Sequence, residues 1–350
     1  MPTPLHPFTQ TLLQWFAAHE RQMPWRHCGD PYAIWLSEVI LQQTRVQQGW
    51  DYWQRFMQRF PTVELLAAAS QDEVLRLWQG LGYYSRARHL HEAARQIVAL
   101  GRFPDTYEAL RALSGVGPYT AAAVASLAFG LPYPALDGNA YRVLARHFGI
   151  PLPIHSTQGQ QTFLALAREL IPADRAADFN LAMMDFGSLQ CTPSSPLCEQ
   201  CPLLLTCIAA RDGKVAQLPM RPKPGDKKTR RFQYIYIRCQ GYTAIHQRLA
   251  GDIWQGLWEL PLTEATSDNT EGPLATTTLP CSPEAEGAET QLLAEGVRHV
   301  LTHQIILASL RLWQPPTRPT LPPDFRWIPE EQLVDYALPR LVEKLLAFLP

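Results

Sequence analysis

The stretch Leu113–Asn139, LSGVGPYTAAAVASLAFGLPYPALDGN, decides how we expect this chain to fold and where we expect a site. Gly115 and Gly117 interrupt two helical patterns, and Pro118 suits the first position of the second helix, where its missing N–H costs nothing. A glycine turn before a helix leaves backbone N–H groups free to bind one phosphate oxygen, such as that of a nucleic acid. The alternative is an ordinary tight connection between two helices.

A carboxylate follows this second helix, which we expect to run over 120–129 and to end near Gly130. The chain then reaches Asp137-Gly138-Asn139, directly before a new amphipathic helix. Asn139 is the residue we expect to cap that helix. Because Asp137 lies two residues earlier, capping does not account for it, and we expect a functional carboxylate close to the glycine turn.

The composition of the chain limits what kind of protein it can be. With 350 residues, 46% of them hydrophobic, it is long enough for two domains that each have a core. It has no apolar run of the 18 or more residues that a membrane span needs, and its N-terminus lacks a signal-peptide pattern. We therefore expect a cytoplasmic protein without a membrane partner. The net charge of −1 means that nucleic-acid binding must depend on local patches.

The pattern of the chain changes once, and this change predicts two domains. Helical patterns follow one another up to about residue 210, which predicts an all-α domain over 1–210. Residues 211–231 are rich in Pro, Gly and cations, as is typical of a linker. Residues 232–350 predict an α/β domain with a mobile insertion at 263–290 and a closing helix at 339–349. The strands expected in it cover 232–239, 242–248, 257–260 and 305–313.

A second carboxylate lies in the segment 31–44, PYAIWLSEVILQQT, which predicts a buried helix that is apolar nearly all round. Glu38 is the acidic residue of this helix and shares a face with Ile34 and Leu41. Burial should raise the pKa of Glu38 toward neutrality, so that it could donate a proton at pH 7. The alternative is a buried Glu that pairs with an Arg for structure. Together with Asp137 it would suit cleavage of a glycosidic bond, in which one carboxyl protonates the leaving group and the other stabilises the sugar cation.

Four of the seven cysteines, at positions 191, 198, 201 and 207, have the spacing C-x6-C-x2-C-x5-C. This is not a disulfide framework. Four thiolates could bind zinc or an iron–sulfur cluster. Zinc sites usually use two short C-x2-C pairs, and only one is present here, so the spacing favours a [4Fe-4S] cluster.

These motifs together resemble the helix-hairpin-helix DNA glycosylases. WLSEVILQQT, GLGYYSRARHL and LDGN resemble in particular the adenine DNA glycosylases of the MutY type. The resemblance implies a mainly α helix-hairpin-helix core with a four-Cys iron–sulfur loop, plus a smaller α/β Nudix-like C-terminal domain. It also implies a monomeric base-excision repair enzyme that removes adenine opposite 8-oxoguanine or G in double-stranded DNA, after the adenine is extruded from the helix.

The resemblance also implies roles for single residues. Glu38 matches the general acid that protonates adenine N7, Asp137 matches the carboxylate that stabilises the sugar cation, and Asn139 would orient the site. The remaining matches are Gly115 and Gly117 in the DNA-binding hairpin, Gln43 and Tyr83 inserted into the base stack, Trp25, Arg26 and Tyr119 around the adenine, and Cys191, Cys198, Cys201 and Cys207 as cluster ligands.

Tyr119 bears on the type of reaction. Related bifunctional glycosylases carry a Lys at the matching position, whose amine forms a Schiff base with the sugar and cleaves the strand. Tyr lacks that amine, so we expect a monofunctional enzyme. The chain departs from its relatives at Leu181, where they carry Glu or Gln facing the adenine, and base selectivity would then use fewer hydrogen bonds.

The C-terminal half resembles the Nudix-like module that this family uses to inspect 8-oxoguanine. GLWELP at 256–261 matches the start of a Nudix box, but the metal-binding Arg-Glu and Glu-Glu pairs do not follow it, so we expect no nucleotide hydrolysis. The family's Phe-Ser-His recognition loop reads Leu301-Thr302-His303 here, which keeps the hydroxyl and the imidazole but loses the aromatic ring.

Two other functions compete with this interpretation. One is a DNA-binding or redox-responsive iron–sulfur protein that has lost catalysis, which the presence of Glu38, Asp137 and Asn139 disfavours. The other is an active nucleotide hydrolase in the C-terminal half, which the missing metal-binding carboxylates disfavour.

Overall fold

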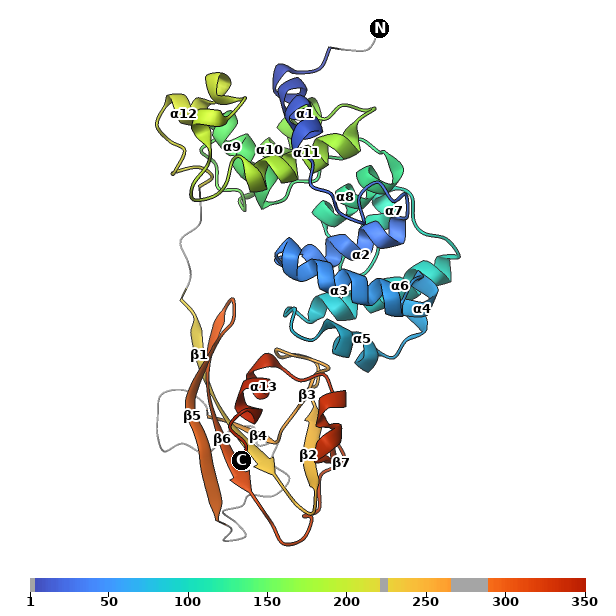
Figure 1. Cartoon of the computed structure of the whole chain (residues 1–350), viewed down its shortest axis with the longest axis vertical. Helices are drawn as coiled ribbons and strands as arrows, with labels where there is room; N and C mark the ends of the chain where they lie inside the picture. The colour runs from blue at the N-terminus through green and yellow to red at the C-terminus, as the bar shows by residue number, and fades with distance from the viewer. Residues whose placement is uncertain (1–3, 221–225, 266–288) are drawn as a thin grey trace. The chain divides into compact units, whose positions relative to one another are not determined.

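A computed structural model describes residues 4–220, 226–265 and 289–350 of the chain (Figure 1). The chain forms two compact units. The first consists of Met1–Ala68 and Glu92–Lys223, and the second of Ala69–His91 and Pro224–Pro350. A short segment from the N-terminal half therefore packs with the C-terminal residues.

The helical pattern of the first 210 residues is confirmed, because the described residues before position 221 form helices and no strands. The second unit takes α5 and the first turns of α6. The helices are α1 (Pro7–His19), α2 (Pro31–Leu41), α3 (Val46–Arg59), α4 (Val63–Ala68), α5 (Gln71–Trp78), α6 (Ser85–Leu100), α7 (Tyr107–Arg111), α8 (Pro118–Phe129), α9 (Gly138–His147), α10 (Thr157–Leu170), α11 (Ala176–Leu189) and α12 (Ile208–Arg211), with 3-10 turns η1 (Cys198–Gln200) and η2 (Leu204–Thr206).

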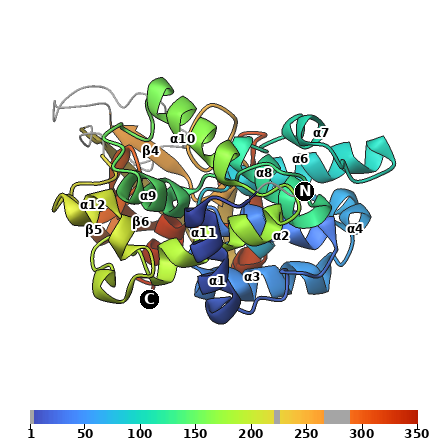
Figure 2. The same cartoon turned by 90° about the horizontal axis from the view of Figure 1, so that it is seen from above.

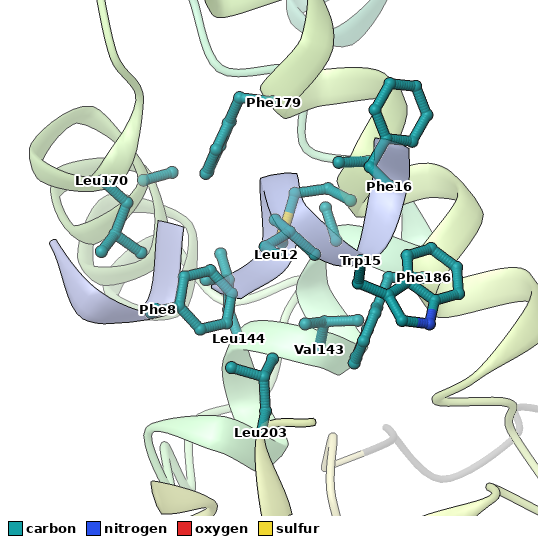
Figure 3. Packing of buried hydrophobic residues seen from close by; sticks show 14 of the residues in the cluster. Phe8, Leu12, Trp15, Phe16, Val143, Leu144, Leu170, Phe179, Phe186 and Leu203 are labelled. Atoms are coloured by element: carbon teal, nitrogen blue, oxygen red, sulfur yellow. The ribbon is translucent and has the colours of Figure 1, made fainter. Parts of the chain in front are cut away.

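The core of the first unit holds the helices that carry the site. Helix α1 buries Phe8, Leu12, Trp15 and Phe16, which are spaced so that they share one face. Helix α1 lies beside α11 (Figure 2). Its buried face packs on residues of α9, α10 and α11, including Phe186, whose ring lies edge-on 4.9 Å from that of Trp15 (Figure 3). This packing fixes α9 and α11, whose residues bound the site described below.

Helix α2 begins where the sequence predicts. The side chain of Asp30 caps it by accepting a hydrogen bond from the N–H of Tyr32 at 2.9 Å, and Pro31 occupies the first position. Helix α2 packs against α8, and nine of its eleven residues are buried. Helix α8 ends at Gly130, whose φ of 67° is the left-handed conformation that glycine adopts without strain.

The C-terminal residues form two sheets. A four-stranded sheet has the order β4-β1-β6-β5 and a three-stranded sheet the order β3-β2-β7. Strands β1 and β6 are parallel, and the other pairs are antiparallel. The elements are β1 (Lys228–Ile237), β2 (Tyr242–Gln247), β3 (Trp258–Glu259), β4 (Leu262–Ala265), β5 (Thr290–Val300), β6 (Gln304–Trp313), β7 (Phe325–Pro329), η3 (Glu330–Asp335) and α13 (Arg340–Leu346).

The strands differ from the sequence prediction in two respects. Strand β1 starts at Lys228, four residues before the expected boundary, because its charged first residues pair with β6 from Gln304 onward. Strands β4, β5 and β7 were not expected. In β5 the register shifts twice, at Leu292/Ala294 and Ala294/Val297, and these irregularities hide the alternation that marks a strand. Most of the expected insertion at 263–290, namely 266–288, lies outside the described residues.

None of the helices in the described part of the chain is both long enough and apolar enough to cross a bilayer.

Candidate active site

A cavity of about 460 Å³ in the first unit brings together most of the residues expected at the reaction centre. The carboxyl groups of Glu38 and Asp137 both line it. So do Tyr119, Asn139, Trp25, Arg26 and Leu181. Residues that lie more than 150 positions apart in the sequence therefore meet at one pocket.

Glu38 lies on the buried face of α2 and is only 7% exposed. The hydroxyl of Tyr119, in the first turn of α8, donates a hydrogen bond to Glu38 Oε2 at 2.8 Å. The pKa of Glu38 is raised to about 7, because burial, helped by the charge of Asp137, outweighs the Tyr119 hydrogen bond and the charge of Arg26, which both lower it. At neutral pH a large share of Glu38 is thus protonated and able to donate a proton, as the sequence predicts.

Tyr119 is a neutral hydrogen-bond donor to Glu38. Burial and the nearby carboxylates hold the pKa of Tyr119 well above its usual value, so the phenol keeps its proton. Tyr119 contributes a hydroxyl to the pocket and no amine.

Asp137 corrects one expectation. Helix α9 starts at Gly138, so Asp137 is itself the N-cap, and its Oδ1 accepts the N–H of Ala140 at 2.7 Å. The apolar pattern of α9 suggested a later start because the first turn of the helix carries Gly138 and Asn139, which are not apolar. Asn139 does not cap the helix; its side-chain amide donates to Asp137 Oδ2 at 2.7 Å. Asp137 can therefore cap α9 and also take part in a reaction as a carboxylate.

The two carboxyl groups have different surroundings. Burial raises the pKa of Asp137 above its usual value, and the N–H of Ala140, the amide of Asn139 and the charge of Arg142 offset part of this rise. Glu38 instead accepts a hydrogen bond from a neutral phenol. The ionised form is therefore better stabilised in Asp137 than in Glu38.

Arg142 is a site residue that the sequence analysis missed. Its guanidinium is buried on α9 and donates to Asn139 Oδ1 at 2.7 Å, to the carbonyl of Gly187 at 2.5 Å and to the carbonyl of Cys191 at 2.7 Å. Helix α11 approaches closely there, since a Cβ on Gly187 would lie 2.5 Å from that of Asn139. A signal was available, because Arg142 and Arg146 lie four residues apart on one face of a helix that contains no acidic residue.

The glycine turn borders a second cavity of about 730 Å³. Gly115 has a φ of 71°, and Gly117 is the N-cap of α8. A Cβ on Gly117 would meet nothing within 4 Å, so the fold itself leaves this backbone open to an outside group. The cavity extends from the turn to Glu38, Asp137 and Gln43. The glycine turn, which is expected to bind a phosphate oxygen, and the two carboxyl groups thus border one continuous space.

Gln43 and Tyr83, expected to enter the base stack, both have unusual backbones. Their φ values are 56° and 47°, in the left-handed region where residues other than glycine are strained. Both side chains are exposed, Tyr83 by 49%. Gln43 lies in the first unit and Tyr83 in the second. Backbone strain at exposed residues is typical of functional positions.

The expected recognition loop connects β5 and β6 in the second unit. Thr302 and His303 are exposed, while Leu301 packs against the core of the sheet domain. The hydroxyl of Thr302 lies 2.9 Å from that of Tyr83. These four residues line a cavity of about 600 Å³ within this unit.

The pocket wall contains further residues that the sequence predicts. Trp25 is buried, with its ring 5.5 Å from that of Trp50 and 5.3 Å from that of Trp53. Leu181 is 3% exposed and lines the pocket from α11. Arg26 is held by Asp185, a fully buried carboxylate of α11 that the sequence analysis missed.

Cys191, Cys198, Cys201 and Cys207 line one small cavity together with Arg146. The guanidinium of Arg146 donates to Cys191 Sγ at 3.4 Å. Four thiols beside a cation suit an anionic iron–sulfur cluster, whose ligands are thiolates. Within the described ranges, no three His, Cys, Asp or Glu side chains are arranged to hold a single metal ion.

Three family models match the chain. HhH-GPD superfamily base excision DNA repair protein matches residues 36–167, the iron-sulfur binding domain of endonuclease III matches 191–204, and the NUDIX domain matches 233–348. The matches confirm the helix-hairpin-helix core, the [4Fe-4S] cofactor and the Nudix-like C-terminal domain.

Two solved structures are similar to the first part of the chain. A thermostable thymine-DNA glycosylase is 32% identical with a TM-score of 0.54, and the match covers 59% of this chain and 95% of that one. Endonuclease III in a non-covalent DNA complex is 23% identical with a TM-score of 0.50, over 59% of this chain and 94% of that one, which shows the fold alone.

Curated relatives identify the family. Adenine DNA glycosylase of Mus musculus is 43% identical over 229 residues, or 61% of this chain and 44% of that protein, and the Homo sapiens protein is 44% identical over 222 residues, or 60% and 41%. This chain thus matches less than half the length of these mammalian relatives. The adenine DNA glycosylase of Buchnera aphidicola from Schizaphis graminum is 32% identical over 73% of this chain and 75% of that protein. The chain belongs to the adenine DNA glycosylase family.

Proposed function

We propose that this chain is a monofunctional adenine DNA glycosylase that removes adenine opposite 8-oxoguanine or G from double-stranded DNA. The observation that carries the proposal is the pair of carboxyl groups in one pocket, Glu38 with a pKa raised to about 7 and Asp137 held by donors that favour its ionised form. Two carboxyl groups with different tasks are what hydrolysis of a glycosidic bond needs.

Each residue has one task in this reaction. Glu38 donates its proton to the adenine ring, so that the base leaves with the electrons of the N-glycosidic bond. Asp137 stabilises the positive charge that develops on the sugar, and Asn139 holds Asp137 in place through their 2.7 Å hydrogen bond. Water adds to the sugar carbon and gives up one proton, which restores the protonated form of Glu38, and the products are free adenine and an abasic site.

DNA would be held by the glycine turn and opened by inserted side chains. The open backbone at Gly117 and the first-turn N–H groups of α8 suit a phosphate oxygen. Gln43 and Tyr83, exposed on strained backbones, would fill the space that the extruded adenine leaves in the base stack. The adenine would then enter the pocket beside Trp25 and Arg26.

The second unit would read the opposite base. Thr302 and His303 offer a hydroxyl and an imidazole that can hydrogen-bond the extra oxygen and the N7–H of 8-oxoguanine, and Leu301 adds only apolar contact. The cluster, bound by Cys191, Cys198, Cys201 and Cys207, would stabilise the loop 191–207 and take no part in the bond cleavage.

The test is single-turnover cleavage of duplexes that contain A opposite 8-oxoguanine, G or T. Glu38→Gln and Asp137→Asn should each bind duplex normally but cleave about 10²- to 10⁴-fold more slowly, the usual contribution of positioned acid–base catalysis. Glu64→Gln, which changes an exposed carboxyl of the same type on α4, is the matched control and should cleave at the wild-type rate. Wild-type cleavage by either pocket variant would show that the assigned role is wrong.

A further inference from the structure

We propose that Asp185 is a positioning residue for the proton donor of the pocket: it fixes the guanidinium groups of Arg21 and Arg26 in the pocket wall and so sets the positive charge that acts on Glu38. The inference rests on the proposed role of Glu38. It adds to that role a residue that does not line the pocket itself.

Asp185 makes a dense set of hydrogen bonds. It is fully buried in α11, and Arg26 binds it through two parallel bonds of 2.8 Å, from Nη1 to Oδ2 and from Nη2 to Oδ1. Arg21 adds a bond of 2.5 Å from Nε to Oδ1 and one of 3.1 Å from its backbone N–H to Oδ2. Each carboxylate oxygen thus accepts two bonds. Such bidentate pairs fix the plane of a guanidinium as well as its position.

This arrangement decides how Arg26 can act on a bound base. Both of its terminal nitrogens donate to Asp185, and Nη1 also donates to the carbonyl of Arg21 at 2.9 Å. These terminal nitrogens are thus directed at other protein groups, although the Arg26 side chain lines the pocket. Arg26 therefore contributes charge and the flat face of its guanidinium to the pocket.

The charged and titratable groups around Glu38 come from several elements. Tyr119 of α8 and Asp137 before α9 act on it directly, and so does Arg26. Arg26 in turn faces Asp185 and Arg21, and its Nη1 lies 3.9 Å from Glu20 Oε1. Glu20 also contacts His27 at 2.6 Å. Asp185 is the fully buried member of this set, so its charge is the least screened by solvent.

Substitutions of Asp185 and of Arg26 should shift the pH dependence of cleavage in opposite directions. Asp185→Asn removes a negative charge that offsets Arg26, so the positive charge near Glu38 grows and its ionised form is favoured. The pH above which cleavage slows should then fall by about one unit, the scale on which a nearby charge acts. Arg26→Gln removes the positive charge and should raise that pH. The double variant should return it toward the wild-type value.

The experiment measures single-turnover cleavage of A opposite 8-oxoguanine by the full chain between pH 6 and 9. Asp178→Asn is the matched control, because Asp178 lies on the same helix, is partly exposed, and pairs with Arg175 at 2.8 Å away from this set. Opposite shifts in the single variants and a near-normal profile in the double variant support the proposal. A uniform loss of rate with the pH profile in place would overturn it and leave Asp185 a structural residue.

The outcome also separates this inference from the proposed function. If wild-type cleavage does not slow at high pH, or if Glu38→Gln shows the same slowing, the role of Glu38 itself fails. If that slowing is present but neither Asp185→Asn nor Arg26→Gln moves it, only the role of Asp185 fails.

Discussion

The guanidinium of Arg142 donates to Asn139 Oδ1 at 2.7 Å, and this contact fixes which way the Asn139 amide faces. Arg can only donate, so the oxygen of Asn139 must point at Arg142 and its NH₂ group at Asp137 Oδ2. Arg142 also binds the carbonyl of Cys191, the first cysteine of the cluster loop. One buried side chain therefore connects the cluster loop to the carboxylate that is proposed to stabilise the sugar.

Replacing Arg142 by Lys should slow cleavage roughly 10- to 150-fold, because one ammonium nitrogen cannot reproduce the bonds that three guanidinium nitrogens donate, and a hydrogen bond from a charged group contributes about 1.5 to 3 kcal/mol. The measurement is the single-turnover rate together with the iron content of the protein. Arg102→Lys, at an exposed arginine, is the control. An unchanged rate in Arg142→Lys at normal iron content would show that the orientation of Asn139 does not depend on this contact.

Glu38 should make the protein less stable as the pH rises. Its pKa is about 7 in the folded chain against 4.5 for the free group, so between these values the unfolded chain is ionised and the folded one is not. The free energy of unfolding should thus fall through this range, by about 3 kcal/mol once the pH exceeds 7. Glu38→Gln should therefore melt at a higher temperature than wild type at pH 8, and the gap should largely disappear at pH 5. An equal difference in melting temperature at both pH values would contradict a raised pKa of Glu38 in the folded chain.

Tyr119 leads to a prediction about the product. Since it has no amine, the wild-type protein should release adenine and leave an intact abasic strand that breaks only on treatment with alkali. Borohydride should trap almost no protein on the DNA, because no Schiff base forms. The control is a duplex with a ready-made abasic site, which reports spontaneous breakage. Strong strand cleavage above that control without alkali would refute the monofunctional assignment.

The local rules of helix start and burial were enough to find Glu38. Asp30 and Pro31 mark the start of α2, and a single acidic residue in an apolar helix stands out. Asp185 lies in the same kind of surroundings, between Met184 and Phe186, and the same argument would have found it. Its partners Arg21 and Arg26, more than 150 residues away, are set by tertiary packing that no local pattern contains.

Asp137 shows the limit of pattern reading at helix ends. The apolar residues of α9 indicate a helix but not its first turn, and the cap is decided by which side chain reaches the Ala140 N–H. In the sheet domain, the irregular register of β5 removes the period of two, so only pairing with β6 reveals the strand. The start of α9 and strand β5 were both missed because each depends on hydrogen bonds that form only once the partner backbone has folded.

The recognition loop should determine which base opposite adenine the protein prefers. Replacing Thr302 and His303 together by Ala removes two exposed hydrogen-bonding groups, each worth about 0.5 to 1.5 kcal/mol, so the preference for 8-oxoguanine over G should fall roughly 5- to 150-fold. Tyr83→Phe, which removes only the hydroxyl 2.9 Å from Thr302, tests whether that contact orients the loop and should give a smaller fall. Cleavage and binding are measured on both mispairs, so the A opposite G duplex serves as the internal control. Equal losses on the two duplexes would mean that the loop holds DNA without reading the lesion, because a group that recognises the extra oxygen of 8-oxoguanine has nothing to bind on G.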